Sequence, residues 1–238
     1  MIFYYVRHGD PIYEPDSLTE YGQKQAEALS KRFSLYGLDE VYTSDSVRAQ
    51  MTAEPTLKRL GLKKTVLDWT NEGFTWNNFT AKDSNGKLQF VFDIKEYKEK
   101  FNSKEARALG AEWYKYSDFG GNTFEEGVKK VDEKVDEFFA GLGFVHDREN
   151  GCYKRLQKNE KRVALFAHAG FGLVFLSSVL DIPYSILSTH FDLSHSAVTV
   201  IWFDEREEKI VPRVLQWCND SHLYKEELLK GYNNNLNI

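Results

Sequence analysis

Ile2-Phe3-Tyr4-Tyr5-Val6, close to the start of the chain, is a short apolar run rich in β-prone residues. A run of this kind predicts a strand buried on both faces. Arg7, His8 and Gly9 follow it at once. Further short apolar runs alternate with stretches of helical periodicity, which is typical of a mainly parallel sheet. We therefore predict an α/β fold, a three-layer sandwich with helices on both faces of the sheet.

The other expected elements follow from the same two periodicities. The predicted strands are Glu40–Thr43, Lys64–Leu67, Val163–Ala167, Ala197–Phe203 and Ile210–Gln216. The last two strands are separated by a charged turn, so we expect an antiparallel hairpin at one edge of the sheet. The predicted helices are Thr19–Phe33, Ser46–Leu60, one that begins at Thr123, and Phe171–Leu180. Thr123 and Glu126 have the spacing of a capping box.

The segment 76–119 has a different character, because it is polar and aromatic and interrupts the alternation. Helical patterns are expected around Ile94–Phe101 and Lys104–Tyr116. We interpret the segment as a helical cap inserted into a single domain that spans residues 1–238. A cap over the strand ends would be a natural place for substrate selection.

Composition excludes several classes of protein. The 238 residues carry a net charge of −5, and Lys and Arg are scattered among Asp and Glu, so nucleic acid is not an expected partner. No apolar run is long enough to cross a bilayer, and the N-terminus shows no basic leader. Cys152 and Cys218 have no C-x-x-C spacing. Two free thiols would fit a reducing cytoplasm, although a single bridge between them stays open.

The residues that follow each predicted strand are chemically distinctive. Arg7 and His8 follow the first strand, Arg48 lies in the first turn of the helix after the second, Glu72 lies in the loop after the third, and His168 follows the fourth. Ligands of open α/β sheets bind outside the carboxyl ends of the strands. These side chains, from distant parts of the sequence, are therefore expected to converge on one site.

Such a set suits a phosphoryl group. The guanidinium groups of Arg7 and Arg48 match phosphate oxygens, and the helix that begins near Ala169 adds backbone N–H donors. Neighbouring arginines lower the pKa of a histidine, so a neutral imidazole is available to attack phosphorus. A carboxylic acid is then needed to protonate the leaving oxygen, and Glu72 is the candidate. Neither a metal nor another cofactor is required, because arginines stabilise the developing charge.

Four ordered motifs in this chain resemble those of the histidine phosphatase superfamily, which includes the cofactor-dependent phosphoglycerate mutases. The four segments are Val6–Gly9, Leu18–Ala26, Thr43–Ala53 and Phe166–Gly170. The resemblance implies that His8 accepts the phosphoryl group, that Arg48 binds phosphate and that His168 is the second histidine. Asn71–Phe74 falls where the family has its proton-donor glutamate, which implies that role for Glu72. The longer segment that mutases have after the first histidine is absent, which favours hydrolysis.

We therefore expect a metal-independent phosphatase that hydrolyses small phosphate monoesters through a phosphohistidine at His8. Two alternatives stay open: a cofactor-dependent phosphoglycerate-type mutase, and a catalytically inactive module that binds a phosphorylated ligand or a protein partner. The expected partner is a small phosphate ester, with no membrane, and the chain is a monomer or a homodimer. His195 lies next to the predicted strand Ala197–Phe203 and is interpreted as structural or as a surface residue, with contact to substrate left open, and His222 and His146 are interpreted as solvated.

Overall fold

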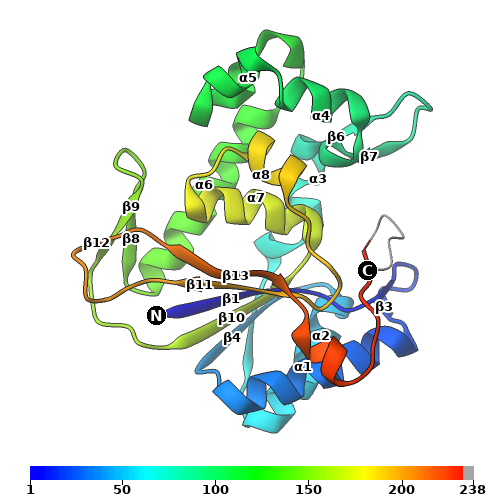
Figure 1. Cartoon of the computed structure of the whole chain (residues 1–238), viewed down its shortest axis with the longest axis vertical. Coiled ribbons are helices and arrows are strands. Elements are labelled where there is room, and N and C mark those ends of the chain that lie inside the picture. Colours follow the sequence, from blue (N-terminus) through cyan, green and yellow to red (C-terminus); the bar gives the residue numbers. More distant parts are fainter. Residues whose placement is uncertain (233–238) are drawn as a thin grey trace. The chain divides into compact units, whose positions relative to one another are not determined.

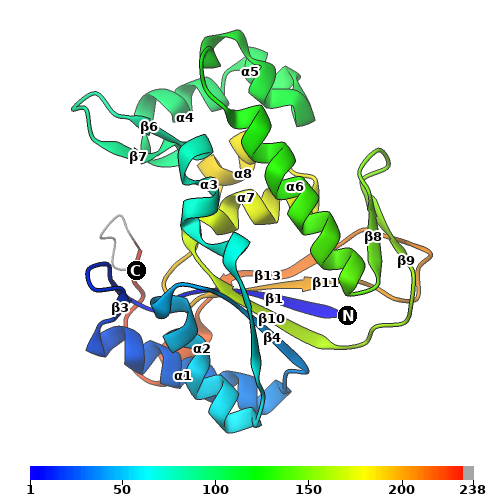
Figure 2. The ribbon, with the colours of Figure 1, turned by 180° about the vertical axis from the view of Figure 1, so that it is seen from behind.

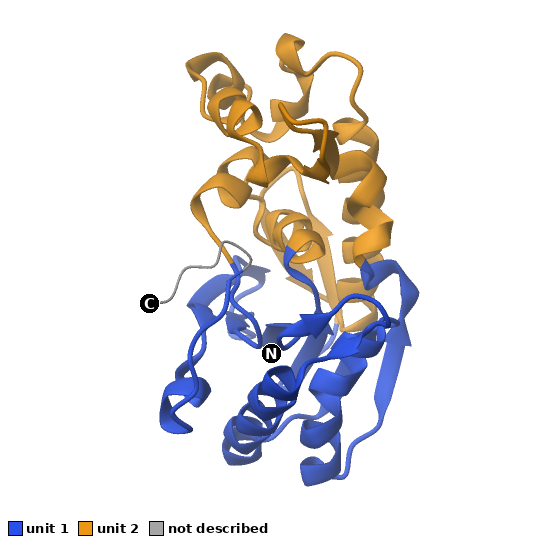
Figure 3. Ribbon diagram, turned by 90° about the vertical axis from the view of Figure 1, so that its right-hand side faces the viewer, with its two compact units in different colours: residues 1–71, 157–169, 193–238 blue, residues 72–156, 170–192 orange. Residues whose placement is uncertain are grey.

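The computed structural model describes residues 1–232, and its central feature is a six-stranded sheet (Figure 1). The chain divides into two compact units (Figure 3). The first comprises Met1–Asn71, Gln157–Ala169 and the chain from Leu193 onward, and the second comprises Glu72–Leu156 and Gly170–Asp192. The predicted cap, residues 76–119, lies within the second unit. A single domain with an inserted cap stays a prediction.

The sheet belongs to the first unit and has the strand order β13-β11-β1-β10-β4-β5. Its strands are β1 (Ile2–Arg7), β4 (Glu40–Ser44), β5 (Lys64–Leu67), β10 (Arg162–Ala167), β11 (Val198–Trp202) and β13 (Arg213–Asn219). The pairs β1–β10, β10–β4 and β4–β5 are parallel, whereas β1–β11 and β11–β13 are antiparallel. The mainly parallel sheet and the antiparallel edge are therefore confirmed, and so is the α/β class.

Two long helices of the first unit, α1 (Glu20–Tyr36) and α2 (Val47–Leu60), lie side by side in Figures 1 and 2. Their apolar side chains form one core with alternate residues of the strands, so they cover one face of the sheet. Members of this core include Leu29, Phe33, Leu57, Tyr4, Val6 and Phe166. The helices predicted for the other face belong to the second unit, and the three-layer arrangement stays a prediction.

The first turns of α1 and α2 are capped by the hydroxyl side chains that precede them. The Thr19 hydroxyl accepts a hydrogen bond from the Gly22 N–H at 2.9 Å, and Ser46 accepts one from Ala49 at 3.3 Å. These contacts satisfy backbone donors that the first turn leaves unpaired. The remaining elements of this unit are short: β2 (Pro11–Ile12), β3 (Ser17–Leu18), a 3-10 turn at Asp68–Thr70, β12 (Lys209–Ile210) and α9 (Ser221–Lys225).

The second unit is mainly helical. Its α-helices are α3 (Glu72–Phe79), α4 (Lys95–Phe101), α5 (Lys104–Ala108), α6 (Phe124–Gly141), α7 (Ala169–Leu180, whose first residue closes a segment of the first unit) and α8 (Tyr184–His190). The hairpins β6–β7 (Thr80–Lys82, Leu88–Phe90) and β8–β9 (Phe144–Asp147, Cys152–Arg155) complete it with 3-10 turns at Val91–Asp93, Gly110–Lys115 and Ser117–Phe119. Its core is a cluster of aromatic rings, including Phe101, Trp113, Phe119, Phe124 and Tyr184.

Three local predictions for this unit are wrong. Thr123 precedes α6 without capping it, because its hydroxyl accepts a hydrogen bond from the Asn78 amide at 2.9 Å instead. The helix expected over 104–116 is a short α5 followed by a 3-10 segment, since Gly110 has a left-handed φ of 55° that breaks the α-helix. Glu72 begins a helix rather than lying in a loop.

Two further findings concern the cysteines and the character of the helices. Cys152 and Cys218 are both free, which settles the open question of a bridge between them. Over residues 1–232, none of the helices combines the length and apolar character that a membrane span requires.

Candidate active site

The first unit brings two histidines together at the carboxyl ends of adjacent parallel strands. β1 and β10 pair so that Arg7 lies opposite Ala167. The next residues, His8 and His168, therefore leave the sheet side by side, and their ring centroids are 5.2 Å apart. The His8 N–H also donates to the Ala167 carbonyl at 2.9 Å, which fixes the backbone at this point.

The His8 ring has one nitrogen committed to the backbone. Its Nδ1 lies 2.7 Å from the carbonyl oxygen of Gly9. A carbonyl oxygen only accepts, so Nδ1 carries the proton and Nε2 keeps its lone pair. Gly9 itself packs so closely that an added Cβ would lie 2.8 Å from the Gly22 carbonyl oxygen. The turn after β1 therefore requires glycine, and it holds the unprotonated Nε2 of His8 in one orientation.

His168 has the opposite tautomer. Its Nδ1 lies 3.0 Å from NH2 of Arg48, and because a guanidinium only donates, Nδ1 must accept. Nε2 therefore carries the proton, and it lies 2.9 Å from the Ser44 hydroxyl and 3.3 Å from that of Ser46. The end of β4 and the cap of α2 thus support the second histidine.

Arg48 is held from its other side by the loop between β2 and β3. Its NH1 donates to Asp16 Oδ1 at 2.9 Å, while Asp16 Oδ2 accepts from the Val47 N–H at 2.7 Å. The Tyr13 ring lies 5.4 Å from the guanidinium carbon. Neither Asp16 nor Tyr13 was predicted, because both lie in an irregular loop whose path the sequence pattern does not reveal.

Arg7 is almost completely buried, with 1% of its surface exposed. NH1 donates to the carbonyl oxygen of Leu193, and NH2 lies 2.7 Å from Nε2 of His195. His195 must accept there, so its Nδ1 carries the proton and faces Asp10 Oδ1 at 3.5 Å. His195 is therefore a support of the site, where sequence reasoning gave it a structural role without naming Arg7 as its partner.

Burial and charge act together on the two histidines. Burial lowers the pKa of His8 well below its ordinary value, and the nearby His168, Arg7 and Arg48 lower it further. The hydrogen bond to the Gly9 carbonyl acts in the opposite direction and raises this pKa. The pKa of His168 is lowered in the same way, first by burial and then by Arg48 and Arg7. Both rings are therefore neutral near pH 7, which is the form that can act as a nucleophile.

This electrostatic arrangement predicts a pH effect on stability. We expect the ring signals of His8 and His168 in NMR spectra to show no titration between about pH 6 and 8. The unfolded chain binds a proton at the ordinary pKa of about 6.5, and the folded chain does not. The free energy of unfolding should therefore fall as pH drops below 6.5, by about 1 kcal/mol per pH unit for each such ring. Urea unfolding at several pH values measures how the free energy of unfolding depends on pH. The His168→Asn variant should show a smaller slope, because one of the two rings is removed. Titration of both rings near pH 6.5 in the folded protein would contradict the prediction.

Glu72 belongs to the second unit, where it is half-buried in the first turn of α3. Its Oε1 accepts a hydrogen bond from the Gly170 N–H at 3.2 Å. Gly170 follows Ala169, the predicted phosphate-binding residue that begins α7. The structure thus brings Arg7, His8, Arg48 and His168 together in the first unit, whereas the proton-donor role of Glu72 and the phosphate contact of Ala169 stay predictions.

The site has no obvious metal ligands. Within residues 1–232, no group of three or more His, Cys, Asp and Glu side chains is arranged to hold a metal ion.

Comparison with known families agrees with these motifs. Residues 3–87 match the family model described as the histidine phosphatase superfamily (branch 1). The match contains the first three motif segments, and the resemblance inferred from the sequence is confirmed. No curated protein matches the chain in sequence.

Solved structures share the fold. A mycobacterial glucosyl-3-phosphoglycerate phosphatase is 20% identical with a TM-score of 0.57, and the alignment covers 91% of this chain and 98% of that one. A phosphoserine phosphatase from Entamoeba histolytica is 14% identical with a TM-score of 0.58, and the alignment covers 93% of this chain and 98% of that one. A putative alpha-ribazole-5'-P phosphatase from Escherichia coli is 15% identical, with a TM-score of 0.58 and coverage of 92% and 98%. The match to the family model supports a phosphatase enzyme, and these solved structures show that the fold is shared.

Proposed function

We propose that this chain, as a histidine phosphatase superfamily protein, hydrolyses small phosphate monoesters through a phosphohistidine at His8. The observation that carries the proposal is the position of a neutral histidine, with a free Nε2 lone pair, beside two guanidinium groups and a second histidine. A binding module needs the arginines but has no use for an oriented nucleophile. This argues against the inactive module.

In the first step Nε2 of His8 attacks phosphorus in line, and the bond between phosphorus and the ester oxygen breaks. Arg7 and Arg48 bind the equatorial oxygens and stabilise the charge that spreads over them, while His168 accepts from Arg48 and holds its guanidinium in place. The departing oxygen takes the proton of the Glu72 carboxylic acid. In the second step water loses a proton to the Glu72 carboxylate and attacks phosphorus. The N–P bond breaks, and inorganic phosphate leaves.

The choice of hydrolysis over phosphate return rests on the segment after His8. Only the short hairpin β2–β3 lies between His8 and the start of α1, where mutases of the family have a longer segment. Several similar folds also belong to proteins named as phosphatases of small molecules. We infer that the substrate is a small phosphate monoester, that the reaction needs no metal, and that two free thiols fit a cytoplasmic protein.

A panel of small phosphate monoesters, assayed for released phosphate with and without EDTA, tests this function. We expect turnover of at least one ester, unchanged by EDTA, and no isomerisation of phosphoglycerates when bisphosphoglycerate is added. Isomerisation that depends on bisphosphoglycerate would indicate the mutase instead. Tight binding of esters with no turnover across the whole panel would indicate the inactive module.

A further inference from the structure

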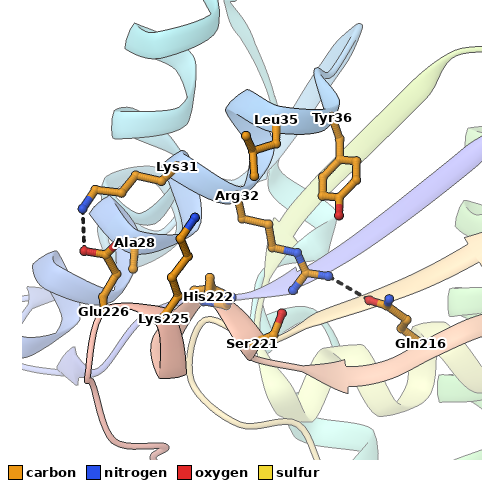
Figure 4. Close-up of a pocket in the computed structure, with 10 residues that line it drawn as sticks. All are labelled: Ala28, Lys31, Arg32, Leu35, Tyr36, Gln216, Ser221, His222, Lys225 and Glu226. Atoms are coloured by element: carbon orange, nitrogen blue, oxygen red, sulfur yellow. Dashed lines mark hydrogen bonds and ion pairs between the residues drawn. The ribbon is translucent and has the colours of Figure 1, made fainter.

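A second hollow in the first unit lies between the C-terminal half of α1, strand β13 and helix α9 (Figure 4). Its volume is about 160 Å³, enough for a small ligand. Its lining residues come from three segments: Ala28, Lys31, Arg32, Leu35 and Tyr36, then Gln216, and then Ser221, His222, Lys225 and Glu226. None of these is among the residues that surround His8.

The lining is positive, although the whole chain has a net charge of −5. Lys31, Arg32 and Lys225 contribute three cations, and Glu226, which pairs with Lys31, contributes one anion. In Figure 4 the Lys225 amine points between Lys31 and Arg32. Within residues 1–232, this amine has no carboxylate partner within ion-pair distance. The hollow therefore holds unneutralised positive charge.

Arg32 is fixed in place by neutral groups. NH1 donates to the Asn219 carbonyl at 3.0 Å and to its side-chain oxygen at 2.7 Å, while NH2 donates to Gln216 Oε1 at 2.8 Å. Burial lowers the pKa of Arg32. The charges of Tyr36, Tyr4 and Asp220 act in the opposite direction and raise this pKa. Asp220 is itself within 3.3 Å of Lys230. The guanidinium is thus oriented in advance, and a ligand anion would meet a positioned charge.

His222 also lines the hollow, and its ring carries an unpaired polar atom. Its side chain is buried, with 4% of the residue exposed, which corrects the prediction that it is solvated. Nε2 lies 3.0 Å from the Ser196 hydroxyl, and within residues 1–232 the buried Nδ1 has no hydrogen-bond partner. Burial, and then Arg32, lower the pKa of His222 to about 3, so the ring is neutral. A buried nitrogen without a partner is unfavourable, and a bound ligand would relieve that cost.

We propose that this hollow is a second anion site, which takes a phosphate group either as inorganic phosphate or as part of a small ester. Arginine and lysine are the side chains that recognise phosphate oxygens, the first through its planar fork and the second as a point charge. The neutral His222 ring can donate from Nδ1 when Nε2 accepts from the Ser196 hydroxyl. The site is independent of the proposed hydrolysis, since it uses none of the same side chains.

The anion site is tested by titrating the ¹⁵N-labelled chain with inorganic phosphate and following amide signals by NMR. The His8→Ala variant is used beside the wild type, so that binding at the hollow is separated from turnover. We expect saturable shifts at Lys31–Tyr36 and Ser221–Glu226 in both proteins. Shifts that are absent, that never saturate, or that chloride at equal ionic strength reproduces would overturn the proposal. Glycerol 2-phosphate, added to His8→Ala in a parallel titration, identifies the ester if it binds more tightly than inorganic phosphate.

Variants make the test specific. Lys225→Gln is expected to weaken phosphate binding about tenfold, because it removes a charge-assisted contact. Lys24→Gln, an exposed lysine of α1 outside the hollow, is the matched control and should leave the affinity unchanged. Glu226→Gln removes the single carboxylate of the lining and should tighten binding about threefold, a gain that misfolding cannot mimic. Equal affinities in all three variants would overturn the proposal.

Discussion

Replacement of His8 by alanine is expected to lower kcat for every turned-over ester by at least about 10⁴-fold, since the bond-forming nitrogen is lost. Arg7, Arg48 and His168 remain, so substrate still binds, and KM should change much less than kcat. The unfolding midpoint should not fall far, because the His8 backbone contacts to Ala167 and Ser196 are kept. Steady-state kinetics and thermal unfolding measure the two effects.

The covalent step has its own readout. Acid-labile, base-stable label from a ³²P-ester should appear on the wild-type chain and be absent from His8→Ala. The control is His190→Ala, which removes an exposed imidazole that bonds to Asn102 and should leave kcat as it is. A His8→Ala protein that turns over normally would end the phosphohistidine account.

Arg48→Lys is expected to lower kcat/KM by about 10²-fold although the charge is kept. The guanidinium bonds at once to Asp16 and to His168 Nδ1, and an ammonium group cannot span both and still face a phosphate. His168 then loses the donor that fixes its tautomer. The loss should fall on kcat as well as on KM, because these contacts strengthen in the transition state.

The matched control for Arg48→Lys is Arg59→Lys on the same helix. Arg59 bonds to Ser30 and Glu27 on α1, and none of these residues surrounds His8. Its replacement should alter stability slightly and leave kcat/KM within about twofold of the wild type, as expected for a partly exposed ion pair. Equal losses in both variants would show that α2 packing, and not phosphate binding, sets the activity.

Much of the first unit could be predicted because its central strands, β1 and β10, are buried on both faces. Val163–Ala167 is continuously apolar, and so is Ile2–Val6, and both are strands whose ends place His8 beside His168. The rule that ligands bind at the carboxyl ends of strands can then be applied to locate the site without any knowledge of side-chain packing. This is why four site residues could be placed together from the sequence.

The supports of the site could not be predicted, because they depend on the path of irregular loops. Asp16 and Tyr13 reach Arg48 from a two-strand hairpin too short to give a periodic signal. In the second unit, Tyr184–His190 forms a helix that was not expected, since seven residues after a proline give too few turns for an apolar stripe. The Thr123 hydroxyl does not cap the helix because it accepts a hydrogen bond from the Asn78 amide. Asn78 is distant in the sequence, so only the tertiary structure reveals this contact.

Ser196 contacts both His8 and His222 from a left-handed backbone conformation. It has a left-handed φ of 61°, its N–H donates to the His8 carbonyl at 3.0 Å, and its hydroxyl meets His222. Glycine would relax the backbone at this position but would delete the hydroxyl, while alanine would keep the strain and lose the hydroxyl as well. Engineering for heat resistance would thus meet a trade-off here, because a more relaxed backbone comes at the cost of the hydroxyl that contacts His222 in the proposed anion site.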